Sequence, residues 1–282
     1  RRKRCLKPFK LRKGASEMQV QEYVKPASLD EAYELLNKSK TNHVIGGCTF
    51  LRKINRKIKT AIDLSDCGLD YIIEEEDCVR IGAYTSLRTI ETSSVVLENF
   101  GTMLAEAMEH LIGVQLRSMI TIGGHMYSRF GFSDINTVML ALNAKIRLYQ
   151  GGIVEYKDFM QLVRPEKDIM VEVILPNEQR RGKVQMMRTS YNDYSIFCLA
   201  VSRSGNDWLI SAGVLPGRPK LVTGVMDYLK ETPITKKDAD RVADMVVSQL
   251  HFGSNYRGSA EYRRSLCQVF AKRAIKELAD ED

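Results

Sequence analysis

Two Gly-Gly pairs, Gly46-Gly47 and Gly123-Gly124, constrain the fold of this chain more than any other feature. Each pair directly follows a short apolar run that reads as a strand. Glycine tolerates positive φ and allows the backbone to approach a ligand closely, so the N–H groups of such turns can bind a phosphate. The hydroxyls of Thr49 and Thr121 would add donors. Either pair alone is more typical of a plain tight turn than of a phosphate site. Together, they could bind both phosphates of a dinucleotide.

The two common phosphate-binding motifs are absent from these turns. A Rossmann fold needs G-x-G-x-x-G between a strand and a helix, and a P-loop needs G-K followed by Ser or Thr. Neither pattern surrounds the glycine pairs. A phosphate site here therefore requires a different fold.

The net charge of +7 comes from the first residues of the chain. Eight of the first 13 residues are Lys or Arg, and the remainder carries 34 basic against 35 acidic residues. The basic leader, residues 1–17, could be a nucleic-acid arm, a remnant of expression, or a solvated tail that tethers the chain to a partner. No aromatic or motif context supports nucleic acid, so we expect no such partner.

The composition excludes several other classes of protein. No apolar run approaches the roughly 20 residues that a membrane helix needs. The six cysteines form no C-x-x-C pair, and no histidine lies at metal-ligand spacing, so we expect no metal site. Free thiols fit a reducing cytoplasm. No hydrolase-type constellation of nucleophile and base is evident, and we assign no catalytic residue.

Periodicity predicts two α/β units followed by an α+β unit. A capping box formed by Ser28 and Glu31 starts the first helix. The first unit has strands at 19–24, 43–45 and 60–64, with helices at 28–39 and 49–57. The second has strands at 71–73, 79–83, 119–122, 138–142, 146–149, 153–156 and 169–175, with helices at 87–92 and 103–111. After a linker at 177–183, strands at 184–189, 196–203 and 208–212 precede helices at 224–230, 236–250 and 260–278.

These motifs resemble the FAD-binding subunits of xanthine dehydrogenase, carbon monoxide dehydrogenase and related molybdenum hydroxylases. The first loop of that family reads A-G-G-T-D-L, and the matching stretch here is I-G-G-C-T-F-L at 45–51. The second reads A-T-I-G-G-N-x-x-x-x-S-P-x-S-D and matches residues 120–134, which end in Ser133-Asp134. Further matches lie at 23–32, 212–216 and 261–264.

The resemblance implies an α+β fold. A two-lobed FAD-binding domain of the vanillyl-alcohol-oxidase (PCMH) type would cover 18–176, with lobes at about 18–70 and 71–176. A small α+β domain of the carbon monoxide dehydrogenase flavoprotein type would cover 184–282. The implied FAD-binding residues are Val44, Ile45, Gly46, Gly47, Cys48, Thr49, Phe50, Leu51, Leu111, Thr121, Ile122, Gly123, Gly124, His125, Asp134, Ile169, Met170 and Arg188.

Several of these residues carry specific expectations. Asp134 would accept hydrogen bonds from FAD hydroxyls, which suits an ionised carboxylate. Phe50 replaces an Asp of the family, Cys48 a Thr or Asn, and His125 an Asn. Phosphate binding by backbone N–H groups does not depend on these side chains. His125 could attach flavin covalently or donate to a phosphate, and we favour donation. Cys48 could be a redox thiol or, as we favour, a packing residue.

Two tyrosines near the start of the C-terminal unit, Tyr191 and Tyr194, could stack on the flavin or pack in an interface.

The implied role is electron transfer within a complex. FAD would receive electrons from an iron–sulfur subunit and pass them to NAD⁺ or another acceptor, while a molybdopterin-binding subunit oxidises the substrate. Because this sequence lacks cluster-binding cysteines, those centres would lie on separate chains. Two alternatives remain: a stand-alone FAD-dependent oxidoreductase, and a scaffold subunit that has lost FAD.

Overall fold

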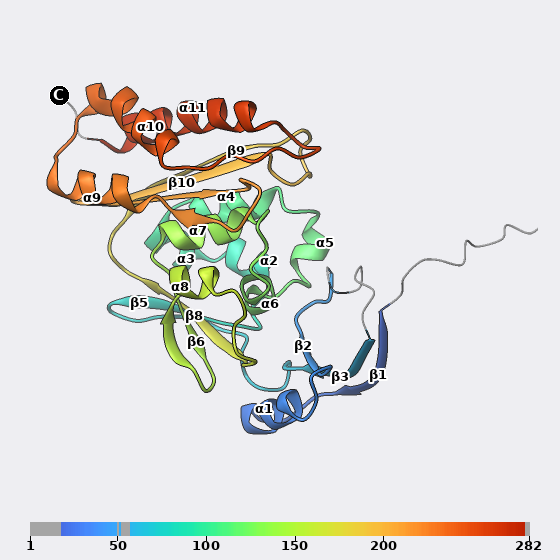
Figure 1. Cartoon of the computed structure of the whole chain (residues 1–282). Coiled ribbons are helices and arrows are strands. Elements are labelled where there is room, and N and C mark those ends of the chain that lie inside the picture. The colour runs from blue at the N-terminus through green and yellow to red at the C-terminus, as the bar shows by residue number, and fades with distance from the viewer. Residues whose placement is uncertain (1–17, 50, 52–56, 280–282) are drawn as a thin grey trace, which may run out of the picture.

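A computed structural model describes residues 18–49, 51 and 57–279, which form three sheets (Figure 1). The predicted basic leader, Phe50 and most of the helix predicted at 49–57 lie outside these residues. Mixed helices and strands in separate sheets confirm the α+β class. None of the helices within the described ranges is long and apolar enough to cross a membrane.

The N-terminal sheet is parallel and small. Its order is β1-β3-β2, with β1 at Gln19–Val24, β3 at Lys57–Asp63 and β2 at His43–Ile45. Helix α1 (Leu29–Asn37) buries Ala32 and Leu36 against it. The Ser28 hydroxyl caps α1 by accepting from the Glu31 N–H at 3.2 Å. The Glu31 carboxylate accepts from the Ala27 N–H, so only one half of the predicted capping box forms.

The second sheet is antiparallel, with order β4-β5-β8-β6-β7. Its strands are β4 (Ile72–Glu74), β5 (Cys78–Gly82), β6 (Lys145–Leu148), β7 (Gly152–Glu155) and β8 (Met170–Pro176). Alternation along β5 directs Val79 and Ile81 into the core and Arg80 to the opposite face. The associated helices are α2 (Leu87–Glu91), α3 (Ser94–Phe100), α4 (Met103–Glu109), α5 (Val114–Arg117), α6 (Ile122–Tyr127), α7 (Asp134–Ala141) and α8 (Tyr156–Gln161).

The third sheet lies between two layers of helices (Figure 1). Its antiparallel order is β12-β11-β10-β9, formed by β9 (Arg181–Met187), β10 (Phe197–Ser204), β11 (Asp207–Gly213) and β12 (Lys220–Leu221). One layer contains α9 (Thr223–Glu231), α10 (Ala239–Ser248) and α11 (Ala260–Leu278), with a 3-10 turn at Lys236–Asp238. The other contains α4 and α7.

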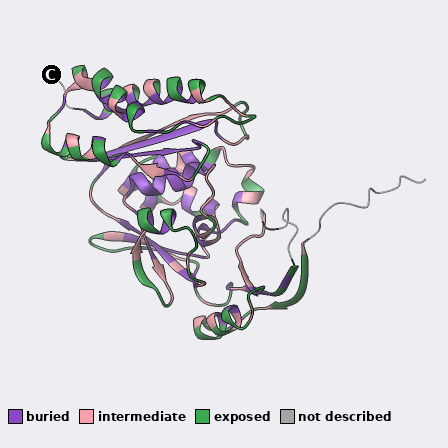
Figure 2. Cartoon of the chain, in the orientation of Figure 1, coloured by how far each residue is buried: buried purple, intermediate pink, exposed green. Residues whose placement is uncertain are grey.

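Strand β10 explains why this sheet joins the two halves of the chain. Phe197 and Leu199 pack into the core formed with α10 and α11. Cys198 and Ala200, on the opposite face, pack into the core that contains α4 and α7. Figure 2 shows the resulting buried band on both sides of β10. An all-apolar strand is expected where both faces of a sheet are covered.

Two predicted strands are wrong. The run at 138–142 lies almost entirely in helix α7, which the Ser133 hydroxyl caps. The apolar run at 119–122 was expected to be a strand that ends at Gly123-Gly124, but helix α6 begins at Ile122 and contains both glycines. The Thr121 hydroxyl caps this helix by accepting from the Gly124 N–H at 3.2 Å. A short run of three apolar residues and one threonine does not distinguish a strand from the start of a helix, and the capping threonine favours the helix.

Candidate functional site

The two glycine pairs lie in direct backbone contact, although 77 residues separate Gly46 from Gly123. A Cβ atom built on Gly46 would lie 2.4 Å from Thr121 Oγ1 and 3.2 Å from Gly124 Cα. A Cβ atom on Gly124 would lie 3.1 Å from the Gly46 carbonyl oxygen. Any larger residue at either position would separate the loops. The structure therefore brings the two pairs together, as binding of one shared ligand requires.

A cavity of about 520 Å³ opens beside this contact. Its volume lies in the range of small-molecule and cofactor sites. Thirteen of the expected residues line it: Val44, Ile45, Gly46, Cys48, Thr49, Leu51, Leu111, Thr121, Gly123, Gly124, His125, Ile169 and Met170. Four do not, namely Gly47, Ile122, Asp134 and Arg188. Phe50 lies outside the described residues.

The first glycine loop offers unused donors. Gly47 and Cys48 both have positive φ, 73° and 51°. Within the described residues, no hydrogen bond is donated by the backbone N–H of Gly47, Cys48 or Thr49. A Cβ atom on Gly47 would lie 2.1 Å from the Met119 carbonyl oxygen, so glycine is required there for space as well as for conformation. This loop has the free N–H groups that a phosphate ligand needs.

The thiol of Cys48 is not set up for redox chemistry. Burial and the nearby Asp63 carboxylate raise the pKa of Cys48, so it stays protonated at neutral pH. A reactive cysteine needs the thiolate. Packing, the favoured alternative, agrees with this environment.

The second glycine loop has its donors occupied. The Gly123 N–H donates to the Ala83 carbonyl at 2.8 Å, and the His125 N–H donates to the Thr121 carbonyl at 3.0 Å. With the Gly124 N–H bonded to the Thr121 hydroxyl, no open set of N–H groups remains. Binding of the FAD diphosphate by both loops stays a prediction, and these contacts leave the second loop with fewer available donors than the first. The second loop supplies a close-fitting wall.

His125 is held beside the cavity by a serine. Its Nε2 lies 2.6 Å from Ser133 Oγ, and the same oxygen accepts from the Asn136 N–H at 3.0 Å as the cap of α7. Burial lowers the pKa of His125 to about 4, so the imidazole is neutral at pH 7. Both His125 and Ser133 line the cavity. A neutral imidazole can donate from one ring nitrogen to a ligand.

Asp134 and Arg188 lie behind the cavity wall, paired with each other. Arg188 Nη2 donates to Asp134 Oδ2 at 2.5 Å, and the Ser195 hydroxyl donates to the same oxygen at 2.7 Å. Burial raises the pKa of Asp134, although Arg188 and Ser195 oppose this effect. Asp134 Oδ1 and Arg188 Nε are buried without partners among the described residues. Contact of either residue with FAD stays a prediction.

Three aromatic residues lie together at the cavity, and of these only Tyr194 was expected from the sequence as a possible flavin contact. Phe130 and Phe132 stack with ring centroids 5.0 Å apart, and Tyr194 meets Phe132 at 4.8 Å. All three line the cavity, whereas Tyr191 does not and contacts Glu109. The signal in the sequence was the F-G-F segment at 130–132, which departs from the S-P-x-S pattern of the family. Aromatic walls suit a planar ring system.

Comparison with known proteins identifies the family. Residues 16–178 match the family described as "FAD binding domain in molybdopterin dehydrogenase". Residues 183–278 match the "CO dehydrogenase flavoprotein C-terminal domain". The chain belongs to the FAD-binding subunits of the molybdenum hydroxylases. Its cofactor is FAD, and the glycine contact, the free N–H groups and the aromatic wall fit that cofactor.

Relatives of full length agree with this family. The chain is 27% identical over 274 residues to the nicotine 6-hydroxylase medium subunit of Paenarthrobacter nicotinovorans, covering 90% of this chain and 96% of that protein. It is 25% identical to the carbon monoxide dehydrogenase medium chain of Afipia carboxidovorans, covering 90% and 95%. A Cu,Mo-CO dehydrogenase structure superposes with a TM-score of 0.81 at 23% identity, covering 92% and 97%, which confirms the predicted fold.

Proposed function

We propose that this flavoprotein subunit passes electrons from an iron–sulfur subunit, through FAD, to NAD⁺ or another acceptor. The substrate would be oxidised on a separate molybdopterin-binding subunit. Bound FAD can take up electrons singly and give up two as hydride. Medium subunits of multi-subunit hydroxylases among the relatives support this arrangement. The share of this chain is to bind and orient the cofactor.

The contact between the two glycine loops carries the proposal. The first loop would donate N–H groups from Gly47 to Thr49 to the FAD diphosphate, because these groups have no acceptor among the described residues. The second would close the cavity around it, with His125 as a further donor. The apolar residues Leu111, Ile169 and Met170 would contact a ring of FAD.

Domain limits and location form part of the same proposal. We propose that the FAD-binding domain covers 18–176 and the C-terminal domain 184–282, in line with the matched ranges. We also propose a reducing, cytoplasmic location. The described cysteines Cys48, Cys67, Cys78, Cys198 and Cys267 are all free, which supports it.

An absorbance scan of the freshly purified full chain tests cofactor retention. Flavin bands near about 370 and 450 nm are expected. A colourless protein that takes up no added FAD would support the scaffold alternative.

Co-expression with affinity capture tests the role in a complex. Iron–sulfur and molybdenum-containing chains should co-purify, and the assembly should reduce NAD⁺ or a dye with substrate. A yellow protein that oxidises a substrate alone, without these chains, would establish the stand-alone oxidoreductase instead.

A further inference from the structure

The segment between α4 and α5 forms part of the cavity wall in an unfavourable conformation. Leu111 and Ile112 both line the cavity. Ile112 has φ of 56°, in the left-handed region where a β-branched residue is an outlier. Such a conformation persists only where the surroundings fix it. The contacts that fix this segment should therefore determine the shape of the wall.

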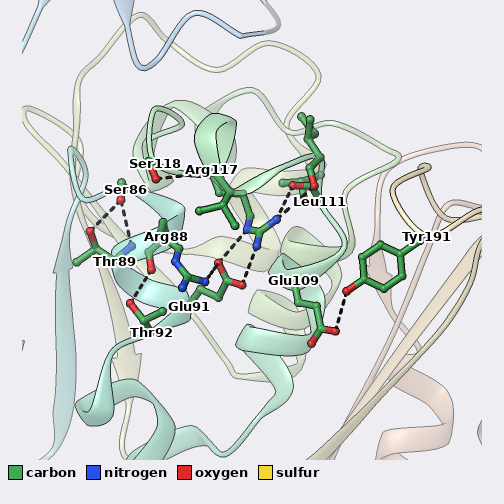
Figure 3. A network of polar contacts seen from close by, with 12 residues as sticks. Ser86, Arg88, Thr89, Glu91, Thr92, Glu109, Leu111, Arg117, Ser118 and Tyr191 are labelled. Carbon is green, nitrogen blue, oxygen red and sulfur yellow. Dashed lines mark hydrogen bonds and ion pairs between the residues drawn. The ribbon is translucent and has the colours of Figure 1, made fainter.

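A buried arginine outside the cavity makes those contacts. Arg117, on α5, is only 4% exposed. Its Nη1 donates to the carbonyl oxygens of Leu111 and Ile112, each at 3.3 Å. Figure 3 shows the guanidinium between these carbonyls and the Glu91 carboxylate. One side chain thus connects the cavity wall to a second helix.

The connection to α2 is a two-point ion pair. Arg117 Nε and Nη2 donate to the two carboxylate oxygens of Glu91, at 2.8 and 2.9 Å. Arg88 pairs with the same carboxylate at 3.1 Å. Burial opposes ionisation of Glu91, but hydrogen bonds from Arg117 and Arg88 prevail and hold its pKa below the ordinary value. A planar guanidinium with five donors can satisfy both partners at once, and an ammonium cannot.

We propose that Arg117 is a positioning residue for the FAD site. Locked by Glu91, it fixes the carbonyls of Leu111 and Ile112 and so holds these two side chains against the cofactor. The inference rests on the proposed place of FAD in this cavity. Arg117 itself does not line the cavity and has no role in electron transfer.

Titration of the deflavinated full chain with FAD tests the proposal. Arg117→Met, which keeps the length and removes the charge, should raise the dissociation constant about tenfold, because the strained wall relaxes. Arg180→Met is the matched control. Arg180 is 9% exposed and pairs with Glu178 and Asp207, and none of the three lines the cavity, so its loss should leave FAD affinity within about twofold.

A second comparison separates positioning from general loss of structure. Ile112→Gly adopts positive φ without strain, so the penalty of Arg117→Met should shrink in that background. Amide hydrogen exchange at 110–113 in the FAD-free protein should rise with Arg117→Met and not with Arg180→Met. Glu91→Gln provides the same comparison if Arg117→Met does not fold.

Three outcomes decide between the hypotheses. Equal loss of FAD affinity in the Arg117 and Arg180 variants would overturn the positioning role. Additive effects of Arg117→Met and Ile112→Gly, with unchanged exchange at 110–113, would also overturn it. Failure of the unmodified chain to bind FAD would instead refute the proposed cofactor site, and the hydrogen-exchange comparison would still test the Arg117 contacts.

Discussion

The two glycine loops are alike in sequence and opposite in structure. The first, at 46–49, has two successive residues of positive φ, and the N–H groups of Gly47, Cys48 and Thr49 have no acceptor among the residues that the structure describes. The second, at 121–125, begins helix α6, and its N–H groups are bonded within the protein. The same Gly-Gly pair is thus proposed to serve ligand binding in the first loop, whereas it packs closely against the protein in the second. A glycine pair indicates that the backbone closely approaches another group. It does not show whether that group is a ligand or another part of the protein.

The largest effect should come from Gly47→Ala in the first loop. The new methyl group would lie 2.1 Å from the Met119 carbonyl oxygen, at a φ of 73° that alanine disfavours. We expect the loop to shift and the FAD dissociation constant to rise at least about hundredfold. Titration of the deflavinated chain measures this.

Gly68→Ala is the matched control for Gly47→Ala. Gly68 has φ of 68°, and a Cβ atom there would meet nothing within 4 Å. It carries the same conformational penalty of about 1 kcal/mol without the collision. If both variants weaken FAD binding alike, the first loop is not the phosphate site.

Gly123→Ala should act on folding rather than on ligand donors. A Cβ atom there would lie 2.6 Å from Ala83 Cβ and 2.7 Å from its carbonyl oxygen. Helix propensity favours alanine by about 1 kcal/mol, but overpacking a buried contact costs about 1–3 kcal/mol. Because backbone atoms cannot yield easily, we expect a net loss of about 2 kcal/mol, measured by urea unfolding without FAD.

Ala83→Gly provides the check on Gly123→Ala. Removing the opposing methyl group should recover part of the lost stability, so the two changes together should cost less than their sum. If the losses in unfolding free energy of the two variants simply added, the side chains at 83 and 123 would not be in steric contact. The packing role of the second loop would then be refuted.

The sequence predicted more of the fold than of the site, because strands and long helices follow local periodicity whereas the site depends on contacts between distant segments. β1 and β2 occupy the residues expected, since strand periodicity is a local property. Helix α6 was missed because its start depends on the Thr121 cap and on packing against Ala83, which lies 38 residues earlier than Thr121. Tertiary contacts decide such short segments.

The site residues divide in the same way. Of the thirteen expected residues that line the cavity, twelve lie in or beside the two loops or at the start of β8, and Leu111 lies between α4 and α5. Arg117 and Phe132 carry no motif, and their importance arises from contacts between distant segments. The pairing of Asp134 with Arg188 also has no signal in the sequence, because it connects α7 with the end of β9.

His125 offers a pH test of the second loop. Burial lowers the pKa of His125 to about 4, below about 6.5 for an unfolded histidine. As pH falls, the unfolded chain takes up this proton first, so stability is lost between about pH 6.5 and 4. His125→Asn should lose about 1–2 kcal/mol less over that range. Urea unfolding of both proteins at pH 7 and 4.5 gives the difference. Equal losses would mean that the imidazole is freely solvated and not part of the packed wall.

Cys48→Gly should have the smallest effect on stability and FAD affinity. It distinguishes binding through the backbone of the first loop from binding through a side chain. Cys48 adopts φ of 51° beside Gly47, so glycine would relieve backbone strain. The greater freedom of glycine in the unfolded chain offsets part of this gain, and we expect stabilisation by about 0.5 kcal/mol. FAD affinity should change less than about twofold, because binding through the backbone N–H does not use the side chain. A tenfold loss of FAD affinity would instead show that the Cys48 side chain itself contacts the cofactor. The first loop would then bind FAD through a side chain as well as the backbone, a distinction that Gly47→Ala alone cannot make.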